Sequence, residues 1–208
     1  MELRTDLLTD LHLDALTEVF NVGAGRAASS LSEIVGDVVK LSVPSVEIKR
    51  SSDVNSIIDA PASDRFGAVS QNFSGAFDAD ALLLFTEEHA LEIVRDMMGS
   101  QMSVEELAEF EQEAMCELGN IILNACISSM ADMLHIALDS SLPSYRIATA
   151  NEIFEGICAK DDLPYVLILH IDLNIEKRQS AGHLIFLLNM KSLENLVVQL
   201  DLFLKGIG

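Results

Sequence analysis

Carboxylates and an amide lie at helical spacing in the stretch DALTEVFNVGAG, which covers residues 14–25. At about 100° per residue, Asp14, Glu18, Asn21 and Gly25 fall within one narrow stripe of a helix. An amide both donates and accepts hydrogen bonds, so Asn21 can hold a water molecule in one orientation. Gly25 has no side chain and lets the backbone of a partner come close. The stripe therefore predicts a site for binding or for positioning water.

A second stretch, EAMCELGNIILN over residues 113–124, repeats the pattern at an offset of 99 residues (117 − 18). Glu113, Glu117, Asn120 and Asn124 occupy the same stripe of a second helix. In a single helix such a stripe is most simply a solvated face. Recurrence favours a functional role, because duplication preserves residues needed for folding more readily than exposed polar ones.

The two stripes need long helices to carry them, and such helices are predicted over residues 10–34 and 103–135. Gly36 closes the first of them. Apolar residues occupy the opposite side of each helix and predict its buried face. In the first helix these are Leu16, Val19, Phe20, Gly23, Ala27, Leu31 and Ile34; in the second they are Met115, Leu118, Gly119, Ile122, Cys126, Met130 and Met133.

The remaining segments also recur in the same order in each half. Alternating, β-branched segments predict strands over 40–50, 66–75, 78–86, 140–150, 164–174 and 181–190. Helices are predicted over 87–99, 151–157 and 191–204, and a polar loop over 51–64. We therefore predict an α+β fold in which two pseudo-symmetric α-β-β-β-α halves form one mostly antiparallel sheet with long helices packed against it. The chain, 1–208, is predicted to be one domain with repeats of about 1–100 and 101–208.

Composition limits the classes of partner. The 208 residues carry a formal net charge of −20, which repels nucleic acid and favours a partner with a positive patch; the charge also serves solubility. The apolar runs are shorter than the roughly 20 residues that span a bilayer, and the N-terminus lacks a signal-peptide pattern. We expect a cytoplasmic protein with no membrane partner. The three cysteines and five histidines show no metal-ligand spacing, so no metal site is predicted.

Two further patterns have competing interpretations. The methionines between Met97 and Met133 are expected in the core, or alternatively in a groove that accepts a partner helix. GAGRAA, at residues 23–28, matches a dinucleotide-binding fingerprint, but it lies inside a predicted helix without a preceding strand. We interpret Gly23 as a packing residue and predict no nucleotide site.

The pattern Asp/Ser-x3-Glu-x2-Asn-x22-Pro resembles the signature of the CheC/CheX/FliY chemotaxis phosphatases. Residues 14–21 match it, and 22 residues separate Asn21 from Pro44. The second half matches it again, with 22 residues between Asn120 and Pro143. The flanking NVGAGRAASSLSEIVG and LSVP are also similar to the family. The likeness covers nearly the whole chain, and its two copies resemble CheC most.

The resemblance implies that the protein hydrolyses the phospho-aspartate of the response regulator CheY. It implies that Asn21 and Asn120 orient the attacking water, while Glu18 and Glu117 pair with a lysine of the regulator. The regulator would supply its own Mg²⁺, and this chain would bind no cofactor. Placing water in line with the breaking bond is the main task that remains.

The other stripe residues are predicted to contact the docked partner: Asp14, Gly25, Glu113 and Asn124. Glu113 departs from the family pattern, which has Asp or Ser at that position. We therefore expect Asn21→Ala to reduce activity more than Asn120→Ala.

Two other functions stay open. One is a non-catalytic chemotaxis adaptor that binds phosphorylated CheY or the receptor deamidase CheD. The other is a flagellar-switch phosphatase like FliY, which the absence of sequence for an extra switch-binding domain disfavours. Turnover of phosphorylated regulator separates the adaptor from the phosphatase.

Overall fold

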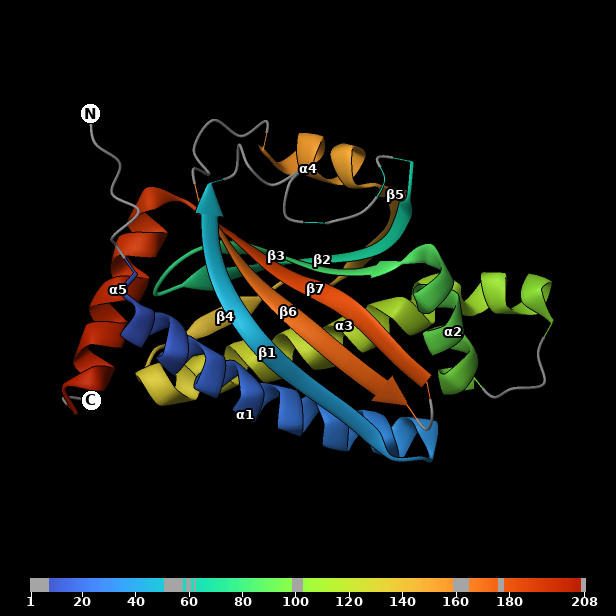
Figure 1. Cartoon of the computed structure of the whole chain (residues 1–208), viewed down its shortest axis with the longest axis horizontal. Coiled ribbons are helices and arrows are strands. Elements are labelled where there is room, and N and C mark those ends of the chain that lie inside the picture. The colour runs from blue at the N-terminus through green and yellow to red at the C-terminus, as the bar shows by residue number, and fades with distance from the viewer. Residues whose placement is uncertain are drawn as a thin grey trace.

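A computed structural model describes residues 8–50, 58, 61, 63–98, 103–158, 165–175 and 178–206. The first half contains α1 (Asp10–Val35), β1 (Val39–Arg50), β2 (Arg65–Gly75), β3 (Ala79–Thr86) and α2 (Glu87–Met98). The second half contains α3 (Val104–Leu134), β4 (Leu138–Ser140), β5 (Ser144–Thr149), α4 (Ala150–Cys158), β6 (Tyr165–Ile175), β7 (Arg178–Leu188) and α5 (Met190–Leu204). Figure 1 shows these elements arranged around one sheet.

The sheet has the strand order β1-β6-β7-β3-β2-β4, with β5 also paired to β2, and every pair is antiparallel. The pair β3–β7 lies at the centre, with Leu83 opposite Leu184. On either side of it, the first strand of one half lies beside a strand of the other half. β1 pairs with β6, and β4 and β5 pair with β2. The two halves thus exchange their first strands.

The long helices pack against each other and against one face of the sheet. A Cβ atom on Gly23 of α1 would lie 2.6 Å from Cα of Cys126 on α3, so the glycine permits this close helix crossing. Phe20 stacks on Phe186 of β7 with ring centroids 5.7 Å apart, which fixes α1 on the sheet. Gly23 therefore has the packing role that the sequence indicates.

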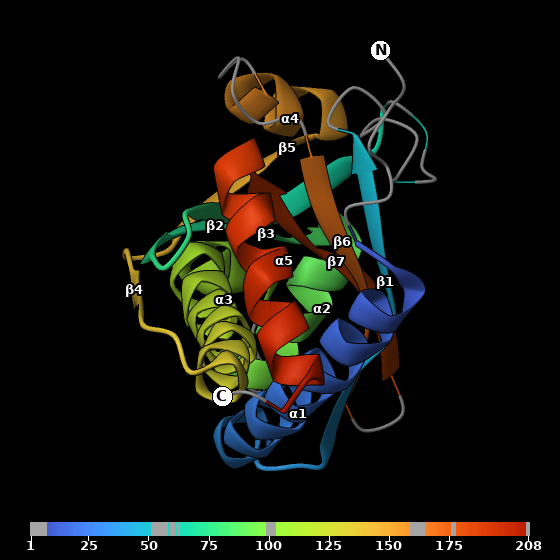
Figure 2. The same ribbon diagram turned by 90° about the vertical axis from the view of Figure 1, so that its left-hand side faces the viewer.

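The two faces of the central strands contribute to separate apolar clusters. On β3, Leu83 and Phe85 belong to the large core beneath α1 and α3, whereas Leu82 and Leu84 belong to a smaller cluster. This alternation follows from the period of two in a strand. The smaller cluster includes Phe154 of α4, and Figures 1 and 2 show α4 across the sheet from the long helices.

Helix ends follow the expected capping chemistry. Thr9 and Ser103 cap α1 and α3 through side-chain and backbone contacts of the capping-box type. Gly36 ends α1 with φ of 74°, a left-handed conformation that glycine adopts without strain. The predicted helices and the fold class are confirmed, with boundaries shifted by one or two residues.

Three predictions need correction or fall outside the described residues. The single strand predicted over 140–150 is two strands, β4 and β5, interrupted around Leu142 and Pro143, so the described sheet has seven strands instead of six. Ile34, predicted on the buried face of α1, is 44% exposed. The polar loop over 51–64 lies mostly outside the described residues. The division into repeats near residue 100 stays a prediction.

Part of α3, Glu109–Leu134, is long and apolar enough to cross a membrane by length and composition. More than half of its most apolar window is buried inside the protein. Core helices of globular proteins share this property, and here the same helix forms the centre of the layer that packs on the sheet.

Candidate functional site

The first polar ridge is the stripe of α1 that holds Asp14, Glu18, Asn21 and Gly25. Asp14, Glu18 and Gly25 are exposed, and Asn21 is half-buried. A Cβ atom on Gly25 would meet no other atom within 4 Å, so the space above it is open. Neither carboxylate has a hydrogen bond or ion pair to another described residue. The ridge faces outward, as the periodicity of the sequence predicts.

The amide of Asn21 is bonded to the protein itself. Its Nδ2 donates to the carbonyl oxygens of Thr17 and Val43, each at 2.9 Å, and its Oδ1 accepts from the backbone N–H of Val43 at 2.9 Å. Val43 belongs to a bulge of β1, where Val43 and Pro44 face a single residue of β6, Ile171. The bulge leaves the N–H and C=O of Val43 without a strand partner, and Asn21 satisfies both.

The second polar ridge is the stripe of α3 that holds Glu113, Glu117, Asn120 and Asn124. Both glutamates are exposed, and both asparagines are half-buried. Asn124 Nδ2 donates to the backbone oxygen of Asn120 at 2.8 Å and to its Oδ1 at 2.6 Å. Within the described part of the chain, Asn120 Nδ2 has no partner. The second amide therefore presents a free donor, whereas the first does not.

The strand beside the second ridge explains this difference. Position 142 corresponds to Val43 at the offset of 99 (142 − 43). Val43 is 1% exposed, but Leu142 is 91% exposed, because residues 141–143 form a bulge that turns this segment outward. Ser141 secures that bulge from the sheet side: its carbonyl accepts from Gln71 Nε2 at 2.7 Å, and its Oγ accepts from the N–H of Asn72 at 3.0 Å. This bulge is therefore held without a hydrogen bond from Asn120.

Cys116 connects α3 to this bulge. Its thiol donates to the carbonyl oxygen of Pro143, with a distance of 3.9 Å between sulfur and oxygen. Burial raises the pKa of the Cys116 thiol above its usual value, so the thiol stays protonated and remains a donor at neutral pH. Thr17 occupies the equivalent position of α1, and its hydroxyl donates to the backbone of Leu13 at 2.8 Å.

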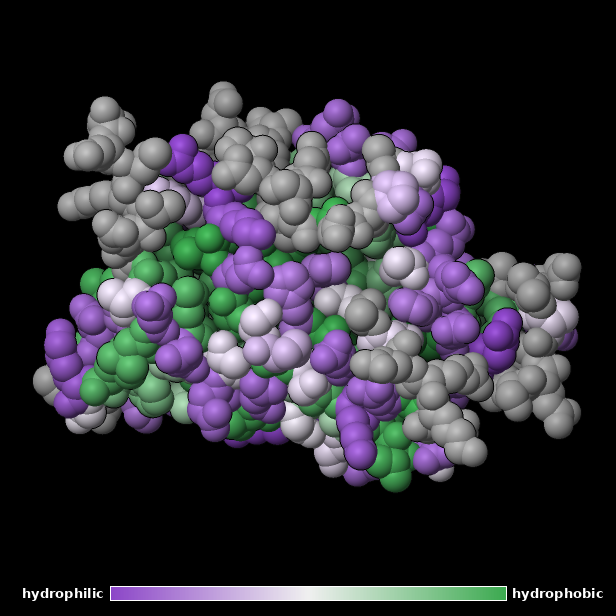
Figure 3. Space-filling view, viewed as in Figure 1, coloured by the Kyte–Doolittle hydropathy of each residue, from purple (hydrophilic) through white to green (hydrophobic). Residues whose placement is uncertain are grey.

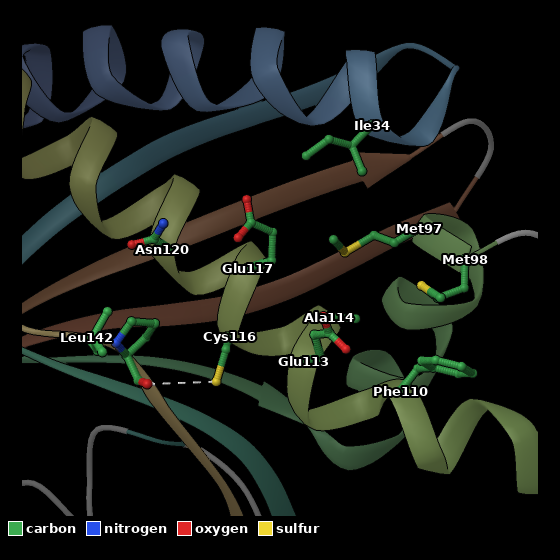
Figure 4. Close-up of a pocket in the computed structure, with 11 residues that line it drawn as sticks. Ile34, Met97, Met98, Phe110, Glu113, Ala114, Cys116, Glu117, Asn120 and Leu142 are labelled. Atoms are coloured by element: carbon green, nitrogen blue, oxygen red, sulfur yellow. Dashed lines mark hydrogen bonds between the residues drawn. The ribbon is translucent and has the colours of Figure 1, made fainter.

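A groove of about 690 Å³ runs beside the second ridge, between α3, the ends of α1 and α2, and the segment that joins β4 to β5. Figure 4 shows Glu117 and Asn120 on successive turns of α3 at this groove, with apolar side chains from other segments around it. The lining residues are Ile34, Met97, Met98, Phe110, Glu113, Ala114, Cys116, Glu117, Asn120, Leu142 and Pro143. Three of the four residues of the second ridge thus line a cavity.

No residue of the first ridge lines this groove. A smaller cavity of about 320 Å³ lies at the other ends of the helices, between Met133, Phe203 and their neighbours, and no residue of the first ridge lines it.

Figure 3 shows apolar side chains gathered over α5 and the start of α1. Leu11, Val198 and Leu202 are exposed residues of those helices.

One acid near the second ridge was not identified from the sequence. Glu111 is buried and accepts a hydrogen bond from the Tyr145 hydroxyl. Burial and this carboxylate both raise the pKa of Tyr145. Glu111 lies two residues before Glu113, on the opposite side of the helix, and it links α3 to β5 instead of facing solvent. Among the described residues, no group of three His, Cys, Asp or Glu side chains is placed to hold a metal ion.

Comparison with known proteins relates the chain to a family. Residues 11–48, which hold the first ridge and its bulge, match the model of the CheC-like family. The chain is 23% identical over 199 residues to the CheY-P phosphatase CheC of Bacillus subtilis, covering 90% of this chain and 93% of that protein. It is 24% identical over 149 residues to the flagellar motor switch phosphatase FliY of the same organism, covering 71% of this chain and 38% of FliY.

The fold has a counterpart of known structure. The crystal structure of Thermotoga maritima FliY superposes with a TM-score of 0.76 at 22% identity, covering 97% of this chain and 99% of that one. A likeness at this identity shows a shared fold. The sequence matches confirm the resemblance drawn from the polar ridges, and the chain is similar to the CheC and FliY proteins.

Proposed function

We propose that the protein is a phosphatase that hydrolyses the phospho-aspartate of a CheY-type response regulator, and that the second ridge carries most of the activity. The similarity to a CheY-P phosphatase supports the substrate class. One observation carries the choice of ridge: Asn120 Nδ2 has no partner among the described residues, whereas both atoms of the Asn21 amide are bonded to backbone.

The chemistry requires little from this chain. Water attacks phosphorus, the bond from phosphorus to the aspartyl oxygen breaks, and the aspartate leaves as a carboxylate with inorganic phosphate as the other product. A regulator with its own Mg²⁺ and lysine would stabilise charge on the phosphoryl group. Asn120 would hold the attacking water in line, and Glu117, three residues earlier on the exposed stripe, would pair with a cation of the regulator.

Asn124 is the positioning residue in this proposal. Its amide donates to Asn120 Oδ1 at 2.6 Å and thereby fixes which end of the Asn120 amide faces outward. Gly25 is the equivalent residue of the first ridge (25 + 99 = 124) and offers no such donor. The bond holds a flexible side chain in one orientation before the regulator docks, which lowers the entropic cost of aligning water.

The first ridge has a different part in the proposal. For Asn21 to donate to water, its Nδ2 would have to release the carbonyl oxygen of Thr17 or of Val43, because both of its N–H groups are already bonded. Each unsatisfied buried group costs about 1–3 kcal/mol. We therefore assign Asn21 to the structure of β1, and leave Asp14, Glu18 and Gly25 available for docking. This order of the two sites is the reverse of the one inferred from Glu113 alone.

Turnover tests the proposal directly. The protein is mixed at one-hundredth of the concentration of the organism's phosphorylated chemotaxis regulator, and release of inorganic phosphate is followed. A phosphatase releases many equivalents of phosphate per molecule of enzyme. An adaptor that only binds the regulator leaves the decay at the spontaneous rate and shows complex formation instead. Glu117→Gln, which removes the charge and keeps the size, is expected to reduce kcat/KM, and Glu194→Gln, at an exposed acid of α5 away from the groove, provides the matched control.

A further inference from the structure

The groove beside the second ridge presents an apolar surface that the proposed chemistry does not use. Ile34, Met98, Phe110 and Leu142 line it and are exposed by 44%, 41%, 37% and 91%. These residues come from α1, α2, α3 and the segment between β4 and β5 (Figure 4). A single exposed apolar residue is ordinary, but four from separate segments around one groove indicate a binding surface.

The charges at the groove restrict what can occupy it. Glu113 and Glu117 line it, neither has a partner among the described residues, and the whole chain carries a net charge of −20. Free phosphorylated metabolites, which bring no cation of their own, are therefore repelled. A complementary occupant has an apolar side chain next to a lysine or arginine. A folded protein surface supplies both groups at once.

We propose that this groove is the docking site for the response regulator, an inference that rests on the proposed function. It receives an exposed apolar side chain of the regulator, flanked by a basic residue, from the surface beside the phospho-aspartate. Asn120 lines the same groove. The phosphorylated site of the regulator and its apolar side chain, which we call the anchor, would therefore contact neighbouring parts of one surface. The anchor contact exists before and during the reaction, so it contributes uniform binding and sets KM more than kcat.

The test uses Leu142→Ser combined with Phe110→Ser in the full chain. Both side chains are exposed, so we expect the variant to fold, which circular dichroism and thermal unfolding check. Steady-state phosphate release from the regulator, phosphorylated with acetyl phosphate, gives KM and kcat. We expect KM to rise at least about tenfold, as for loss of a main interface anchor, with kcat within about twofold. The control is Val198→Ser, which also replaces an exposed apolar side chain by serine but lies on α5, outside the groove. It is expected to leave KM and kcat unchanged.

The outcomes separate this proposal from the proposed function. If KM is unchanged in the double variant while Asn120→Ala has lost activity, the docking proposal is wrong and the phosphatase assignment stands. If the wild-type protein releases no phosphate, the function is wrong, and affinity for the beryllofluoride-loaded regulator decides the groove: weakened binding of the double variant supports it, and equal binding overturns it. A dimer in light scattering that the double variant dissociates would assign the groove to a second copy instead and overturn the proposal.

Discussion

The two polar ridges share a glutamate and an asparagine at the same spacing, yet their asparagines make different contacts. Asn21 bonds to the backbone of Val43 inside a buried bulge, whereas Asn120 accepts from Asn124 and its Nδ2 has no partner in the described part of the chain. The strand beside each ridge causes the difference, because one bulge faces inward and the other outward. The same motif thus makes different contacts at its two occurrences, since the neighbouring backbone decides whether the amide bonds to the strand.

The strongest test of this comparison is Asn120→Ala. We expect kcat to fall at least about 100-fold, which corresponds to about 2.7 kcal/mol of lost transition-state stabilisation. Stability is expected to change little, because only Asn124 among the described residues bonds the side chain. Phosphate release under saturating regulator measures the effect. Asn120→Asp, which is isosteric but has no donor, is expected to be as inactive; wild-type activity in both variants would contradict the role.

The converse change, Asn21→Ala, is expected to affect stability. The N–H and C=O of Val43 would lose their partners, which costs about 2–3 kcal/mol, and Tm is expected to fall accordingly. Activity per folded molecule is expected to stay within about threefold of wild type, well short of the effect of losing a catalytic donor. Urea unfolding, together with phosphate release at a temperature where the variant is folded, gives both values. A stable but inactive variant would reverse the assignment of the two ridges.

Asn124→Ala sharpens the comparison, because it removes the hydrogen bond from Asn124 to Asn120 Oδ1, which has no equivalent on the first ridge. The Asn120 amide would then rotate, and we expect kcat to fall about tenfold, or about 1.4 kcal/mol, with KM nearly unchanged. Asn124→Gln keeps an amide on a longer side chain and is expected to recover part of kcat. A purely structural role would instead lower stability in both variants and leave kcat per folded molecule unchanged.

The smallest effect is expected from Cys116→Thr, which places on α3 the residue type that α1 has at the equivalent position, Thr17. Its sulfur contact to Pro143 is long, and thiols are weak donors, so the free energy of unfolding is expected to change by less than about 1 kcal/mol. Activity is expected to stay within twofold. Because burial raises the pKa of Cys116, iodoacetamide is expected to alkylate it slowly at pH 8 and faster as pH rises further. Rapid alkylation at pH 7 would mean that the bulge opens.

Much of the fold follows from sequence periodicity. The alternation of residues in the strands and the stripes of α1 and α3 predict the elements and their exposed faces. The exchange of first strands between the halves was not predicted, because periodicity identifies strands but not their neighbours. The break between β4 and β5 was also missed, although Pro143 has no N–H to donate and was a signal against one continuous strand.

The sequence predicts the exposed position of the two ridges, and it does not predict the contacts of their amides. Helical angles place Asn21 and Asn120 on open stripes, but they do not show that the Asn21 amide reaches the neighbouring strand. One signal was available: the interval of 22 residues that separates each asparagine from a proline relates a helix position to a particular bulge. The groove depends on side chains from four segments, so only the alternative placement of methionines at a partner surface pointed toward it.

The exchange of β1 and β5 between the halves has a consequence for how the molecule could be divided. Each half alone would lack the strand that covers one side of its own hairpin, β2–β3 or β6–β7, and would expose an unpaired edge. The arrangement therefore resembles two subunits that exchange a strand and are joined by a peptide link. We expect fragments 1–98 and 103–208, produced separately, to be poorly soluble alone and to reconstitute one heterodimer when mixed.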